Sequence, residues 1–316
     1  MTAPWSTELP SWSVLASFEA LAVTPGAYVF AVVLGLLFGS LANVCIYRLP
    51  PSDEFPEGRS IVKPGSHCFA CKQPIRWYDN VPLLAWLWLR GKCRNCKAAF
   101  SSRYLLVEAL TGASFGFAWW IAVVAPILWE PFDHRVIHFA VYAAFVFTLV
   151  VITFIDLDTW LILDKITYPA IPIFYGASFL LGHRWFDGLM GAAVGYGLVW
   201  LISEFYLRVR KLDALGLGDA KLLAVVGALL GWKGVAFALG GGSVIGLVIM
   251  VPNELVQRSR GKQRPGPPTD DEAAPDSDGN PSLLHTALPF GPFLCAAALF
   301  YLFAEPWLQL NFHLGV

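Results

Sequence analysis

Long apolar segments recur along the whole chain and are separated by shorter polar ones. A helix that crosses a bilayer needs about 20 mainly apolar residues, or somewhat fewer where neighbouring helices shelter it. Eight segments approach this length, with approximate limits 27–46, 105–129, 136–155, 166–181, 189–207, 220–231, 235–251 and 288–308. Glycine pairs within them, such as Gly191 and Gly195, permit close helix approach in lipid. The pattern predicts an all-α polytopic membrane bundle of about eight transmembrane helices.

The composition agrees with a membrane protein. Hydrophobic residues make up 56% of the chain and charged residues only 14%, whereas soluble domains have about 25% charged residues. The 13 Trp and 23 Phe residues suit a protein with aromatic side chains at the bilayer interface. A net charge of −1 excludes a nucleic-acid binder that works through bulk charge. We therefore expect membrane lipid as a partner and no nucleic acid.

The basic residues predict how the chain is oriented. All but three of the 22 Lys and Arg residues lie in or beside polar segments that eight spans would place on one side of the membrane. The three exceptions are Arg135, Arg184 and Lys233. Cytoplasmic loops carry the excess of Lys and Arg, so the basic side is cytoplasmic. The first basic residue is Arg48, so a secretory signal peptide with a basic start is not expected and the N-terminus lies outside.

This orientation predicts six successive regions. They are an extracytoplasmic segment (1–26), the first transmembrane helix (27–46), a cytoplasmic zinc-binding domain (47–104), a transmembrane core (105–256), a disordered polar cytoplasmic loop (257–287) and the last transmembrane helix with the C-terminus (288–316). The polar loop is rich in Pro, Gly, Asp and Ser and has too few apolar residues to fold.

Four cysteines in the first cytoplasmic region have the spacing of a structural zinc site. Cys68 and Cys71 form one Cys-X-X-Cys pair, and Cys93 and Cys96 form a second pair 21 residues later. Two such pairs supply four thiolates to one tetrahedral Zn²⁺. The alternative is two disulfides, but thiolates persist in the reducing cytoplasm. A four-cysteine site leaves no open position on the metal, so the zinc is expected to be structural.

Carboxylates at the edges of the apolar segments are the candidates for chemistry. Asp156 directly follows an apolar run, with Asp158 and Asp164 close behind it, and Asp219 ends the sequence Gly216-Leu-Gly218-Asp219. Ionisable groups at the rim of a span are costly and are functional candidates by default. Two carboxylates brought together can share a proton and activate a water molecule. For Asp158 and Asp164, each taken alone, a polar cap where a helix leaves the lipid is the favoured interpretation.

Together these features resemble the type IV prepilin leader peptidases, a family of bacterial membrane aspartyl proteases. The resemblance extends from Gly39 to Leu294 and rests on the order of several short motifs. These are Gly39-Ser40-Leu-Ala-Asn43-Val-Cys-Ile-Tyr47-Arg48-Leu-Pro50, the two Cys-X-X-Cys pairs, Ser102-Arg103-Tyr104-Leu-Leu-Val-Glu108, Ile155-Asp156, Gly216-Leu-Gly218-Asp219-Ala-Lys221 and Pro289-Phe-Gly-Pro-Phe293. The family usually has Pro before its second acidic residue, where this chain has Leu163.

The resemblance implies a catalytic pair, Asp156 and Asp219, at the cytoplasmic face of the bacterial inner membrane. It implies removal of the short basic leader of type IV prepilins or secretion pseudopilins, with cleavage after Gly, from substrates held by an apolar N-terminal helix. Many members then methylate the new N-terminus from S-adenosylmethionine, although this chain lacks the Gly-rich nucleotide loop of soluble enzymes. Substrate-binding or supporting roles would fall to Gly216, Gly218, Lys221, Asp158, Asp164 and Glu108. Glu108 would either line the site or cap and pack a helix.

Two other classes of function remain open from the sequence. A transporter or channel with a cytoplasmic zinc domain would also use intramembrane acids and Gly-rich, broken helices. A membrane-anchored redox or metal sensor would use the four cysteines. The acids gather at one rim rather than at the midplane, and eight spans exceed what an anchor needs. Both observations favour the peptidase.

Overall fold

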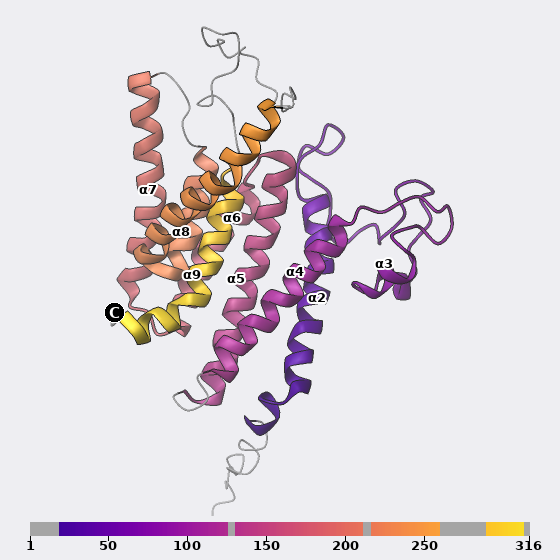
Figure 1. The fold of residues 1–316 in the computed structure, drawn as a ribbon, viewed down its shortest axis with the longest axis horizontal. Helices are drawn as coiled ribbons and strands as arrows, with labels where there is room; N and C mark the ends of the chain where they lie inside the picture. Colours follow the sequence, from indigo (N-terminus) through magenta and orange to yellow (C-terminus); the bar gives the residue numbers. More distant parts are fainter. Residues whose placement is uncertain (1–18, 126–129, 211–215, 260–288, 313–316) are drawn as a thin grey trace, which may run out of the picture. The chain divides into compact units, whose positions relative to one another are not determined.

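The computed structural model describes residues 19–125, 130–210, 216–259 and 289–312. Within these residues the chain is helical and has no β-strand, as the hydropathy pattern predicts. The principal helices (Figure 1) are α2 (Pro25–Arg48), α4 (Arg103–Trp119), α5 (Phe132–Thr159), α6 (Asp164–Leu180), α7 (Trp185–Arg210), α8 (Leu217–Ser259) and α9 (Gly291–Phe312). Three short elements complete the described part: η1 (Trp77–Asn80), α3 (Leu84–Trp88) and the π-helical turn η2 (Trp120–Val124).

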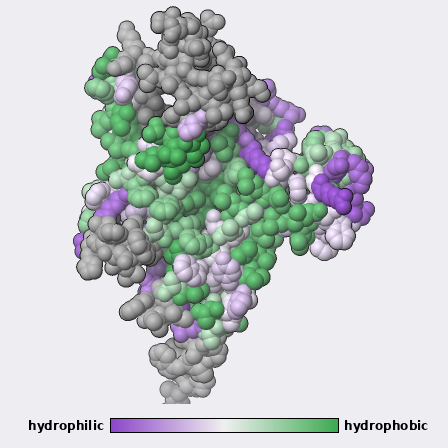
Figure 2. Space-filling view, viewed as in Figure 1, coloured by the Kyte–Doolittle hydropathy of each residue, from purple (hydrophilic) through white to green (hydrophobic). Residues whose placement is uncertain are grey.

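Five of the described helices are long and apolar enough to cross a membrane. They are Pro25–Arg48, Arg103–Val124, Phe132–Thr159, Trp185–Val209 and Leu217–Ile249. Many large apolar side chains on them are exposed, for example Leu247 and Val248 on α8, and Figure 2 shows broad hydrophobic areas on the surface. A protein with this surface is stable in lipid rather than in water. The chain is therefore an integral membrane protein.

The predicted number of eight spans is not fixed by these five helices and stays a prediction. Helix α6 has 17 residues and contains Pro169 and Pro172. The sixth and seventh predicted segments both lie within α8, which is interrupted at Gly231 (φ 67°, ψ −174°). Only glycine adopts such a conformation readily, so α8 consists of two helical segments that meet where the sixth predicted span ends.

The chain divides into two compact units. The first contains residues 1–45 and 60–147, and the second contains residues 46–59 and 148–316, with the division falling inside α5. The predicted zinc-binding region 47–104 is thus divided between the two units, because its first residues, up to 59, belong to the second unit. There Lys165 of α6 contacts both the carbonyl oxygen and the carboxylate of Glu57. The predicted segment 1–26 and the polar loop 257–287 lie largely outside the described residues, although α8 extends to Ser259.

In the first unit, α2 and α4 pack through glycines spaced four residues apart. A Cβ atom on Gly39 would lie 2.6 Å from the Cα atom of Glu108, and one on Gly112 would lie 2.6 Å from Cδ2 of Leu36. Such close contact between helices requires small residues at the interface. The N-terminal span is therefore held directly against the helix that follows the cysteine-containing region.

In the second unit, α8 is the central helix and packs against α6, α7 and α9 (Figure 1). Its side chains Leu222, Leu223 and Leu229 are fully buried. The backbones of α7 and α8 touch at Gly191 and Gly227, where a Cβ on either residue would overlap the carbonyl oxygen of the other. The helix that carries Asp219 is thus fixed by backbone contact along its length.

Candidate functional site: an acidic pair and a four-cysteine cluster

Asp156 lies near the end of α5 and is only 4% exposed. Its Oδ2 atom is buried and has no hydrogen-bond partner among the described residues. A buried carboxylate oxygen without a partner is costly, because it has given up water and gained nothing. Native proteins keep such a group mainly where a ligand, substrate or water completes it.

Asp219 lies in the first turn of α8, within the second unit and partly exposed. Its backbone N–H donates a hydrogen bond to the carbonyl oxygen of Gly216 at 3.0 Å, so the four-residue motif forms a turn that opens the helix. A Cβ on Gly218 would lie 3.0 Å from the Cβ of Ile162, which leaves little room for a side chain there. Gly218 therefore serves close packing beside the turn that presents Asp219, whereas a Cβ on Gly216 would have no neighbour closer than 3.9 Å.

The two carboxyl groups are near enough to interact electrostatically, although 63 residues separate them in the chain. Both also interact with the buried Cys295 of α9. The structure thus brings Asp156, Asp219 and the start of α9 together within one unit. A pair of interacting carboxyl groups can share a proton, so that one serves as a base while the other serves as an acid.

Gly291 is a residue of this site that sequence reasoning did not single out. It begins α9, and its backbone amide lies against the Asp156 carboxyl group. A Cβ at this position would lie 2.5 Å from Oδ2 of Asp156 and 3.3 Å from Cδ1 of Ile162. The only signal in the sequence was the motif Pro289–Phe293, to which the pattern alone assigns no role.

The predicted supporting residues separate into two groups. Lys221 donates a 2.5 Å hydrogen bond to Oδ1 of Asp164, and its ammonium lies 5.1 Å from the centre of the Tyr168 ring. This pair joins the start of α6 to the start of α8. Asp158 is exposed on α5. Glu108 belongs to the first unit, where it accepts the Leu83 backbone N–H at 2.8 Å and interacts with Ser40.

The four predicted zinc ligands converge in the first unit. The Sγ atoms of Cys68, Cys71, Cys93 and Cys96 all lie within 4.8 Å of one another, and none of the four is in a disulfide. The Sγ–Sγ distances are 3.7 Å for Cys68–Cys96 and 4.0 Å for Cys71–Cys93. A tetrahedron with Zn–S bonds of about 2.3 Å has edges of about 3.8 Å. The donors therefore fit a four-thiolate metal site.

The two cysteine pairs have the same backbone design. The N–H of Lys72 donates to the carbonyl oxygen of Cys68 at 2.9 Å, and that of Lys97 donates to Cys93 at 3.1 Å. Both lysines have positive φ, 58° and 60°, which lets each chain turn back directly after its second cysteine. Two equivalent turns that each present two thiolates are the arrangement expected of a metal site built from paired knuckles.

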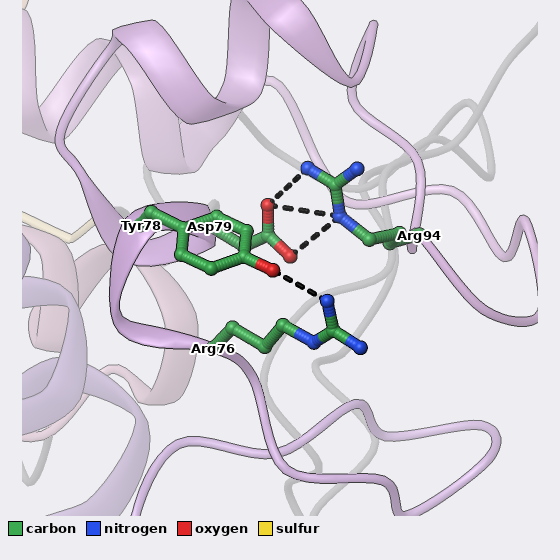
Figure 3. A network of polar contacts seen from close by, with 4 residues as sticks. All are labelled: Arg76, Tyr78, Asp79 and Arg94. Carbon is green, nitrogen blue, oxygen red and sulfur yellow. Dashed lines mark hydrogen bonds and ion pairs between the residues drawn. The ribbon is translucent and has the colours of Figure 1, made fainter.

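An ion pair links the turn that carries the second cysteine pair to η1 (Figure 3). Arg94 binds both carboxylate oxygens of Asp79 at 2.5–3.1 Å, while Arg76 donates to the Tyr78 hydroxyl at 2.5 Å. Hydrogen bonding by Arg94 lowers the pKa of Asp79 below its usual value, so the carboxylate stays charged. A bidentate Arg–carboxylate pair fixes orientation as well as distance. It holds the segment between the two cysteine pairs in place.

Comparisons with known proteins assign the acidic pair and the four-cysteine cluster, each within its own unit, to one family. The model described as Bacterial Peptidase A24 N-terminal domain matches residues 33–122, which include the four cysteines. The model described as Type IV leader peptidase family matches residues 143–251, which include Asp156 and Asp219.

Curated relatives extend the match over most of the chain. A Prepilin leader peptidase/N-methyltransferase of Myxococcus xanthus is 33% identical over 89% of this chain and 91% of its own length. Proteins of the same name from Aeromonas salmonicida and Neisseria gonorrhoeae are 32% and 35% identical, over 83% and 72% of this chain and 85% and 83% of their own lengths. No solved structure gives a significant match. The chain therefore belongs to the type IV prepilin leader peptidase family.

Proposed function

We propose that this protein is an aspartyl endopeptidase that removes the basic leader of type IV prepilins or pseudopilins, with cleavage after Gly. The observation that carries the proposal is the buried Oδ2 of Asp156, which has no hydrogen-bond partner among the described residues. The Asp156 carboxyl group also interacts electrostatically with Asp219, and both residues lie in the part of the chain that matches the leader peptidase family. Family membership favours this function over the transporter or channel considered above.

In the proposed reaction the two carboxyl groups act on one water molecule. The ionised carboxylate takes a proton from the water while its oxygen bonds to the carbonyl carbon of the scissile peptide. The other carboxyl group, still protonated, gives its proton to the leaving amine as the C–N bond breaks. The products are a leader that ends in Gly and a mature chain with a free amine, and the pair has exchanged protonation states.

We place this reaction at the cytoplasmic face of the inner membrane, with the N-terminus outside and the zinc-binding region in the cytoplasm. The distribution of Lys and Arg supports this orientation. A substrate held by its apolar helix would reach the site by lateral diffusion. The Zn²⁺ would be bound by Cys68, Cys71, Cys93 and Cys96 and would hold their two turns together.

A second activity, methylation of the new N-terminus from S-adenosylmethionine, is proposed from the family alone. Among the described residues we identify no set of side chains suited to that cofactor. The same cleavage assay can detect this activity, because methylation adds the mass of one methyl group to the mature product.

The test is cleavage of a purified prepilin by the full-length protein in detergent, read at the substrate N-terminus by mass spectrometry. Asp156→Asn and Asp219→Asn should each abolish cleavage while the protein remains folded and loaded with zinc. Asp187→Asn, which changes an acid in the first turn of α7, is the matched control and should cleave normally. A near-normal rate for Asp219→Asn would refute the proposed chemistry.

A further inference from the structure

Helix α3 exposes an apolar face in the cysteine-containing region of the first unit. Leu84, Leu87 and Trp88 are 66%, 57% and 82% exposed. Their spacing of three and four residues places them on one side of the helix, which we call the α3 face. Trp86 points elsewhere, since its ring packs where a Cβ on Gly91 would lie 2.8 Å away. Within the described residues the face is therefore exposed, whereas Ala85 and Trp86 on the rest of α3 are partly buried.

A hydrogen bond fixes the place of α3 relative to a membrane-spanning helix of the same unit. The N–H of Leu83, directly before α3, donates to Oε2 of Glu108 at 2.8 Å. Glu108 is 9% exposed and lies in α4, inside the span Arg103–Val124. Leu83 itself has a positive φ of 56°, an uncommon conformation for a residue with a side chain. The start of α3 is thus held at the level of Glu108.

The length of the span indicates how deep this level is. At 1.5 Å per residue, the 22 residues of Arg103–Val124 extend about 33 Å, which is close to the roughly 30 Å thickness of the hydrocarbon core. Glu108 is five residues beyond Arg103, or about 7.5 Å along the helix. A span centred on that core begins about 1.5 Å outside it, so Glu108 lies about 6 Å inside the boundary between headgroups and acyl chains. The α3 face, held at this level, therefore lies near that boundary and not in bulk water.

The residues around the α3 face match the chemistry of that boundary. Trp is enriched where membrane and water meet, and here Trp88 is accompanied by two leucines. Exposed Arg90 and Lys92 follow directly in the chain. Basic side chains beside an apolar helical face are typical of segments that lie in the surface of an anionic bilayer.

We propose that the α3 face inserts into the headgroup and acyl-chain boundary of the bilayer that contains the protein's own spans. The occupant of this surface is anionic phospholipid. The cysteine-containing region is then held at the membrane by the helices on either side of it and by α3 as a third contact. This inference goes beyond the proposed function, and lipid contact can be measured whether or not the protein cleaves a prepilin.

The experiment uses full-length protein in nanodiscs of phosphatidylglycerol and phosphatidylethanolamine. The photo-reactive residue benzoylphenylalanine replaces Trp88, or replaces Val62 in a matched control, and adducts are read by intact mass after irradiation. Val62 is 74% exposed in an irregular segment of the same unit, outside α3. We expect phospholipid adducts at position 88, with a yield at least fivefold above that at position 62.

Equal yields at the two positions, or no lipid adduct at position 88, would overturn the proposal. An adduct to a second copy of the chain at position 88, in place of lipid, would also overturn it and would identify a self-association surface. The same measurement with a prepilin present tests whether substrate replaces lipid at this face. Loss of the lipid adduct in favour of a prepilin adduct would count against a lipid-binding role.

Discussion

Gly291→Ala tests whether the start of α9 sets the geometry of the acidic pair. The new methyl group would lie 2.5 Å from Oδ2 and 3.2 Å from Cγ of Asp156. Ordinary contact begins near 3.4 Å, so the carboxyl group or the start of α9 must move by about 0.9 Å. A misplacement of about 1 Å can lower an enzymatic rate about 100-fold, which corresponds to about 2.7 kcal/mol.

The overlap should cost less in stability than in rate. Extra volume in a well-packed site typically costs about 1–3 kcal/mol, and Gly291 is at the end of its helix, where a small shift is easier. We expect prepilin cleavage to fall about 100-fold, while the melting temperature of the purified protein falls by only a few degrees.

The assay is the initial rate of prepilin cleavage in detergent, compared with Gly240→Ala. Gly240 lies in α8 of the same unit and has no atom within 4 Å of an added Cβ, so alanine there should leave the rate unchanged. A Gly291→Ala rate within threefold of the unmodified protein would refute the reasoning. It would mean that the Asp156 carboxyl group can move by this distance without lowering the rate of cleavage.

Three further changes test other parts of the structure. Cys71→Ser should lower the zinc content of the purified protein, measured by elemental mass spectrometry, because it removes one of the four thiolates. Arg135→Met should lower the melting temperature, since it leaves the buried carbonyl oxygen of Val123 without its 2.8 Å donor, a loss of about 1–3 kcal/mol. Leu163→Pro should raise stability by about 0.4–1 kcal/mol, because Leu163 already has φ −75°, which proline favours.

Each of these changes has an outcome that would contradict it. Unchanged zinc in Cys71→Ser, measured beside the buried Cys45→Ser as control, would exclude the four-cysteine site. Arg135→Met with an unchanged melting temperature would show that water replaces the guanidinium. A less stable Leu163→Pro would indicate that the backbone N–H at this position makes a bond that the structure does not contain.

The helices were predictable because each long apolar segment is by itself apolar enough to be more stable in lipid than in water. The four-cysteine cluster was predictable for a similar reason, since both pairs are local motifs and one metal needs both. The predicted boundary between the sixth and seventh segments falls at the break at Gly231 in α8. These features depend on short stretches of sequence, and the structure agrees with them.

The remaining site features depend on contacts between distant segments, which hydropathy and spacing do not encode. Gly291 meets Asp156 across 135 residues, and only the packing of α9 brings them together. The sequence left two roles open for Glu108, and it did not indicate that the Glu108 carboxylate accepts a hydrogen bond from the Leu83 backbone N–H, directly before α3. The contact of Arg94 with both carboxylate oxygens of Asp79 is likewise not encoded in the hydropathy or the spacing.

The backbone contact between Gly191 and Gly227 has a consequence for how this protein tolerates mutation. At most positions in a membrane helix, alanine is the mildest replacement, yet at these two it is excluded because a single methyl group would overlap the facing carbonyl. Gly197, on the same helix as Gly191, has open space around it and accepts that replacement. Selection should therefore conserve Gly191 and Gly227 as strictly as a catalytic residue, although no atom of this α7–α8 contact takes part in the proposed reaction.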